Sequence, residues 1–183
     1  MYHIGCDKSC YNSEAKTMQY KNVKLTFNRE QILYDIKNVA YIEGHKLDEK
    51  QQHIQHTIVD ICEEGNIDRV NRILYNVYLS VVEMLYPYTK NEIMDNMLNN
   101  DMREPDEYII NMLVPETMSQ TSINILNTLI HEYFVTYVIR DWLGILLPES
   151  SQYWMLKLAG IEKDITSVKN RRSTTLTRPN HPF

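Results

Sequence analysis

The sequence predicts an all-α fold, namely a helical bundle with one long overhanging helix, an extended N-terminal arm and an extended basic C-terminal tail. Two observations predict the helices. Five glycines and six prolines in 183 residues are few for an all-β protein, which would need many turns. Apolar residues also recur at helical spacing through most of residues 28–169. We therefore expect an arm over 1–27, a helical domain over 28–169 and a docking tail over 170–183.

The first helix is expected over residues 28–44. Asn28 can cap it, Gln31 stands at the spacing of a capping box, and Gly44 is a suitable last residue. A second helix is expected over 48–64, with a narrower apolar stripe. Both helices should pack one face into the core and leave the other in solvent.

Five further helical segments follow. The segment 68–86 keeps the helical pattern throughout, and two short amphipathic pieces are expected over 91–99 and 106–113. A long helix is expected over 116–146 and a last one over 150–169. At roughly thirty residues the long helix would measure about 45 Å. That length exceeds a compact bundle of this size, so we expect it to overhang and to lie on a neighbouring molecule.

The N-terminal arm is predicted because residues 1–27 show no helical periodicity. Residues 23–27, VKLTF, alternate between apolar and polar as a short strand would. The formal net charge of −5 is unevenly spread, being +3 over 1–29, +4 over 169–183 and −12 between them. An acidic body with basic ends is a poor general nucleic-acid binder, because the body repels phosphate. Acidic protein surfaces are better partners for such ends.

The cysteines and the hydropathy predict a protein of a reducing compartment that does not associate with a membrane. Cys6, Cys10 and Cys62 make an odd number, and the first residues lack the apolar region of a secretory leader. We therefore expect free thiols in a reducing environment. No run of eighteen apolar residues occurs, so no membrane association is expected.

One group of side chains has the spacing of a metal site. It lies in DEKQQHIQH and comprises Glu49, His53, His56 and Asp60. Spacings of four, three and four residues place them on one helix face, where imidazole and carboxylate can bind a transition metal. The alternative is an ordinary solvated face, since the isoleucines of this helix lie on its opposite side. The second interpretation is favoured, and no cofactor is expected.

Two other patterns are incomplete as metal sites. His3, Cys6 and Cys10 supply only half of a zinc site. His131 in LIHEYF lacks the second histidine, four residues on, that a metalloprotease helix carries, so we expect it in a helix interface. No glycine-rich phosphate loop and no nucleophile motif occurs. The sequence therefore predicts no enzymatic activity.

Tyrosine is abundant, with thirteen residues. This side chain gives a large contact area at low entropic cost and is favoured at interfaces. We expect Tyr78, Tyr133 and Tyr137 in the core. The remaining tyrosines favour a surface that contacts other chains.

The closing residues, RRSTTLTRPNHPF, have no apolar periodicity. Two prolines exclude a helix and three threonines favour extended backbone. We predict an arm whose arginines pair with carboxylates of another subunit while the terminal phenylalanine fills a pocket. The alternative is a frayed, solvated terminus. The predicted partner-binding residues are Lys169, Arg171, Arg172, Arg178 and Phe183.

The second half of the chain carries a resemblance. The run YVIRDWLGILLPE, the helix after it and the closing RR…TRPNHPF resemble small helical virion proteins of tailed, crAss-like bacteriophages, of the head-completion or ring-adaptor type. The resemblance is best over residues 116–183. It implies a head-to-tail connector in the virion neck, made in the host cytoplasm, that forms a homo-oligomeric ring, commonly a dodecamer. Its neighbours would be the portal and other neck and tail proteins, and DNA would only pass through.

Two other functions stay open from the residues alone. The first is a small helical metalloenzyme that uses the group around His53 and His56. The second is an intracellular regulatory module whose ends fold on a binding partner.

Overall fold

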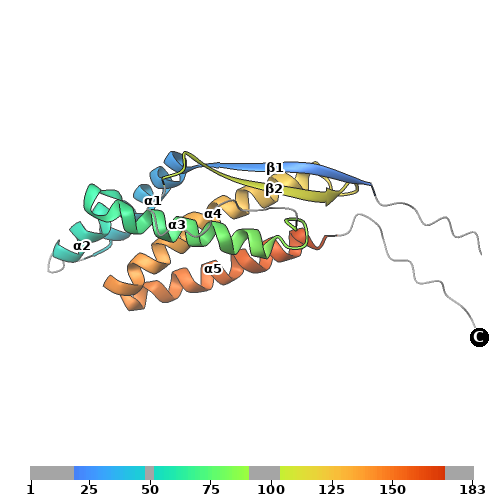
Figure 1. The fold of residues 1–183 in the computed structure, drawn as a ribbon. Coiled ribbons are helices and arrows are strands. Elements are labelled where there is room, and N and C mark those ends of the chain that lie inside the picture. Colours follow the sequence, from blue (N-terminus) through green and yellow to red (C-terminus); the bar gives the residue numbers. More distant parts are fainter. Residues whose placement is uncertain (1–18, 48–51, 91–103, 172–183) are drawn as a thin grey trace, which may run out of the picture.

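The computed structural model describes residues 19–47, 52–90 and 104–171, and in these ranges the chain is mostly helical with one two-stranded sheet (Figure 1). The elements in chain order are β1 (Tyr20–Asn28), α1 (Arg29–Gly44), α2 (Gln52–Val59), the 3-10 turn η2 (Asp60–Cys62), α3 (Glu64–Met84), β2 (Glu107–Pro115), α4 (Gln120–Leu146) and α5 (Pro148–Lys169).

The sheet corrects the expectation of an all-α fold. β1 pairs antiparallel with β2 along its whole length, from Tyr20 opposite Pro115 to Asn28 opposite Glu107. The segment expected as a helix over 106–113 is thus a strand, and the alternation of residues 23–27 is a true strand signal. Residues 20–27 of the expected arm belong to the folded body, because β1 contributes buried side chains to the core.

The sequence signals for α1 are confirmed. The side-chain oxygen of Asn28 accepts a hydrogen bond from the backbone N–H of Gln31 at 3.1 Å, and the helix ends at Gly44. The glycine is needed for packing, since a Cβ there would lie 2.9 Å from the Cγ2 atom of Val59. A larger residue at position 44 would therefore require the Val59 side chain, and with it the contact between α1 and α2, to shift.

The second and third helices differ from expectation at their ends. The segment expected as one helix over 48–64 is α2 followed by η2, and residues 48–51 lie outside the described part. α3 already begins at Glu64 and presents a continuous apolar face to the core. The short helix expected over 91–99 also lies outside the described ranges.

Helix α4 is long, but it does not overhang the domain. Its 27 residues span about 40 Å, and α5 runs antiparallel along it, with Tyr133 hydrogen-bonded to Glu162 and Glu132 paired with Lys157. Buried residues occur along its length, from Ser122 to Leu143. The helix is covered by its own domain, so its length gives no argument for a neighbouring molecule.

The core lies between the sheet and the helices. Phe134 of α4 is fully buried, and its ring lies 5.7 Å from Phe27 of β1 and 5.4 Å from Tyr108 of β2, measured between ring centroids. One aromatic cluster therefore joins both strands to α4. Figure 1 shows the sheet along one side of the helices, with β1 at the outer margin and β2 nearer to α3. None of the described helices combines the length and apolarity needed to cross a membrane.

Candidate functional site

The end of α5 is fastened to the rest of the domain by Lys169. Its ammonium group donates hydrogen bonds to the backbone oxygens of Met84, at 2.6 Å, and Tyr86, at 3.2 Å. These carbonyls lie at the C-terminal end of α3, where a positive charge is favourable. Lys169, predicted to bind a partner, thus already has an intramolecular role.

Tyr88 brings this end of α5 next to the sheet. Its hydroxyl donates to the backbone oxygen of Lys169 at 3.2 Å, and its own backbone oxygen accepts from the N–H of Leu113 in β2 at 2.8 Å. The N–H of Glu116, just after β2, donates to the oxygen of Gln19 at 2.9 Å. The start of β1 and the end of α5 therefore lie at the same end of the molecule (Figure 1).

This arrangement separates charge along the molecule. The basic residues at the C-terminus follow α5, which ends where β1 begins. In residues 1–29 the charges before β1 cancel, and the positive charge belongs to Lys21 and Lys24 in β1 and to Arg29 after it. The opposite end, where η2 leads into α3, carries exposed carboxylates. These are Asp60, Glu63, Glu64 and Asp68. The end of α5, which the basic C-terminal residues follow, and these carboxylates thus lie at opposite ends of the described body, which the sequence could not show.

Among the other predicted partner-binding residues, only Arg171 falls in the described part. It is exposed, and its backbone N–H donates to the oxygen of Val168 at 3.2 Å, just beyond α5. Arg172, Arg178 and Phe183 lie outside the described residues. The structure therefore fixes where the predicted arm starts.

The side chains considered as possible metal ligands fall only partly in the described residues. His53, His56 and Asp60 are exposed on α2 and η2, and Glu49 lies outside the described ranges. His3, Cys6 and Cys10 also lie outside them. Across residues 19–47, 52–90 and 104–171, no three histidine, cysteine or acidic side chains are grouped so that they could hold a metal ion.

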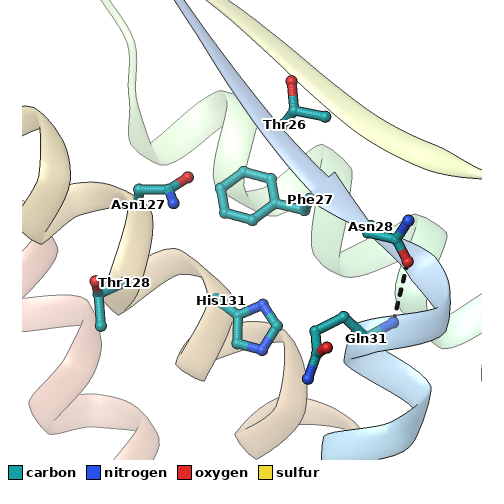
Figure 2. Close-up of a pocket in the computed structure, with 7 residues that line it drawn as sticks. All are labelled: Thr26, Phe27, Asn28, Gln31, Asn127, Thr128 and His131. Carbon is teal, nitrogen blue, oxygen red and sulfur yellow. Dashed lines mark hydrogen bonds between the residues drawn. The ribbon is translucent and has the colours of Figure 1, made fainter.

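A pocket of about 320 Å³ lies where β1, α1 and α4 meet (Figure 2). The end of β1 forms one wall and the helix face of α4 the other. Its lining residues are Thr26, Phe27, Asn28, Gln31, Asn127, Thr128 and His131. Apolar atoms make up most of the lining surface, and the lining side chains also offer amide, hydroxyl and imidazole groups that can bind a polar side chain.

A hydrogen-bonded group borders this pocket. The Nε2 atom of His131 lies 2.7 Å from the Oδ2 atom of Asp35, and the Gln31 side-chain amide donates to both carboxylate oxygens of Asp35 at 3.2 Å. His131 is thus part of a helix interface, as expected. The neighbouring Thr128 hydroxyl is bonded to the backbone oxygen of Asn124, so it is not aligned as a nucleophile.

Replacing Asp35 by alanine should have only a small effect on stability. The side chains of Asp35 and His131 are 34% and 29% exposed, so water screens their interaction. We expect the free energy of unfolding to fall by less than about 1 kcal/mol, measured by urea denaturation. A loss several times larger would indicate that the pair is a major structural element.

The tyrosines divide between core and surface. Tyr133 is buried, as expected, whereas Tyr78 and Tyr137 are only partly buried against the core. Burial, followed by the neighbouring Glu162 carboxylate, raises the pKa of Tyr133 well above its usual range. Several tyrosines are more than half exposed. These are Tyr20, Tyr34, Tyr41, Tyr86 and Tyr153.

Comparison with known proteins adds no relative. Neither the family profiles, nor the curated proteins, nor the solved structures contain a match to this chain.

Proposed function

We propose that the protein is a non-enzymatic structural subunit that assembles with copies of itself into a ring, and that its C-terminal segment docks on a neighbouring subunit. The observation that supports this best is that the basic C-terminal residues follow α5 at one end of the body, whereas exposed carboxylates of η2 and α3 lie at the other end. Unlike ends attract, so head-to-tail contact between copies is electrostatically favoured. Such heterologous contacts close into a ring when the rotation between subunits allows it.

The location proposed for this ring comes from the resemblance of residues 116–183 to crAss-like phage adaptors. We propose the virion neck, next to the portal, with DNA passing through the channel. The net charge of −12 over residues 30–168 supports this role, because an acidic channel wall would not hold DNA. Arg171, Arg172, Arg178 and Phe183 would then contact the next subunit or the portal.

Deletion of residues 171–183 tests the docking role of the tail. The deletion leaves Lys169 in place, so the contacts that fasten α5 to α3 are kept. We expect the helical domain to fold with nearly unchanged stability, within about 1 kcal/mol, and the rings formed by the full chain to be lost. Mass photometry and electron microscopy measure assembly, and far-UV circular dichroism checks the fold.

Two matched variants separate charge from length. Replacing Arg171, Arg172 and Arg178 together by glutamine should weaken assembly, whereas replacing all three by lysine should largely preserve it and its sensitivity to salt. Normal rings from the deleted chain would show that the tail is not a docking arm. A full chain that stays monomeric and binds a different protein would instead favour a regulatory module.

A further inference from the structure

The outer edge of β1 is open within residues 19–47, 52–90 and 104–171. The Arg29 N–H donates to the oxygen of Asp106, and the Glu116 N–H donates to the oxygen of Gln19. In an antiparallel pair every second residue bonds to the partner strand, and these two bonds show which residues do so here. The backbone groups of odd-numbered residues of β1 bond to β2, and those of even-numbered residues point away from it. Within the described ranges no hydrogen bond reaches the backbone of Tyr20, Asn22, Lys24 or Thr26 on that edge.

The other edge of the sheet is covered. The Tyr78 hydroxyl donates to the backbone oxygen of Ile109 at 3.0 Å, and the Leu113 N–H donates to the oxygen of Tyr88 at 2.8 Å. Both groups point outward from β2, and α3 with the turn after it occupies their side. The two edges therefore differ, and among the described elements it is the edge of β1 that is free to accept a further strand.

The C-terminal end of β1 adds a second feature. Its outer edge leads to the pocket of about 320 Å³ (Figure 2). Asp35 lies next to this pocket, because it contacts the lining residue His131. Two exposed carboxylates, Glu30 and Glu107, lie at the same end of the strand pair. An extended segment on this edge would thus end beside acidic groups, which favour an arginine.

We infer that the outer edge of β1 is the acceptor for the C-terminal segment of a neighbouring copy, which adds to the sheet as a third strand through residues 174–177. This inference rests on the proposed ring and specifies the contact between its neighbouring subunits. The segment reads TTLT, rich in the β-branched residues that suit a strand. Arg172 precedes it and Arg178 follows it, so either strand direction places an arginine near Asp35.

The alternative occupants fit less well. Two copies of β1 paired about a two-fold axis would place their Lys24 side chains opposite each other, because Lys24 is central in Tyr20–Asn28. The tail of the same chain starts beside Tyr88, on the far side of β2. It would have to pass around both strands before it could reach the open edge. A neighbouring copy approaches this edge without that detour.

Cysteine pairs between different chains test the contact. One population of the full chain carries Thr26→Cys and an affinity tag, and the other carries one cysteine at residue 174, 175, 176 or 177. Both also carry Cys6→Ser and Cys10→Ser. Cys62 is kept, because it is buried and burial raises its pKa to about 11, which leaves it as an unreactive thiol.

A disulfide between the two populations can form only between chains. Because side chains alternate along a strand, we expect positions 174 and 176, or 175 and 177, to link about tenfold better than the other two. Ala159→Cys, on the exposed face of α5, serves as a control and should not link. Equal linking at all four positions would overturn the strand geometry.

The remaining outcomes separate this inference from the proposed function. Rings without any link to residue 26 would overturn the β1 acceptor and leave the ring standing. No rings in mass photometry and no link would overturn both. Lys24→Pro, which removes an outward N–H, should abolish linking, whereas Lys24→Thr should retain it. If circular dichroism shows that the proline variant does not fold, the inference is still tested by whether the disulfide yields alternate along positions 174–177.

Discussion

Replacing Phe134 by alanine is expected to lower the free energy of unfolding by about 3–5 kcal/mol, measured by urea denaturation with tryptophan fluorescence. The side chain is fully buried between Phe27 of β1 and Tyr108 of β2. Its removal leaves a cavity between α4 and both strands, because the sheet cannot collapse onto the helix without breaking its own packing. The loss of near-ultraviolet circular dichroism should accompany the loss of stability.

Two matched variants identify the cause of this effect. Phe134→Leu keeps most of the volume and should cost no more than about 1.5 kcal/mol. Leu156→Ala removes an apolar side chain that is 75% exposed on α5 and should change stability by less than about 0.5 kcal/mol. If Phe134→Ala costs no more than Leu156→Ala, the sheet does not pack on α4 as described.

Alkaline pH is expected to destabilise the domain by several kcal/mol. Burial raises the pKa of Cys62 from 9.0 to about 11 and that of Tyr108 from 10.0 to about 12, and it also raises the pKa of Tyr133. Raised values mean that the unfolded chain ionises first. The stability is thus fully present below pH 9 and is lost as pH rises toward 11–12. A shift of two units corresponds to about 2–3 kcal/mol for each group.

Tyr108→Phe isolates one of these contributions. The Tyr108 hydroxyl is buried and has no hydrogen-bond partner in the described part of the chain. Its removal should leave stability at pH 7 unchanged or raise it by about 1 kcal/mol. It should also reduce the alkaline loss by about 2–3 kcal/mol, seen in urea denaturation between pH 7 and 11.5. Tyr34→Phe, at an exposed position of α1, should leave the pH profile unchanged.

Local sequence signals were sufficient to predict the helices that have a capping residue or a long run of apolar residues at helical spacing. The Asn28 cap, the apolar face of α3 and the last helix all follow from contacts within a few residues, which sequence spacing determines directly. The residue bounds were less exact. α5 begins at Pro148 rather than residue 150, and α4 begins at Gln120 rather than residue 116.

The segment 106–113 shows why the sheet was missed there. Tyr108, Ile109, Met112 and Leu113 fit one helix face, but Tyr108, Ile110, Met112 and Val114 also alternate with a period of two. A short apolar run fits either period. The strand form prevails because β1, more than seventy residues earlier in the chain, supplies its hydrogen-bond partner.

The surfaces proposed for contact with other subunits also arise from residues that are far apart in the chain. Composition and charge predicted basic segments at both ends of the sequence and an acidic middle, because these are properties of residue order alone. The tertiary structure decided that α5 ends beside the start of β1, that Lys169 is bound to the end of α3, and that the outer edge of β1, next to a pocket, is uncovered by the described residues. These features arise from residues far apart in the chain, so no local spacing encodes them.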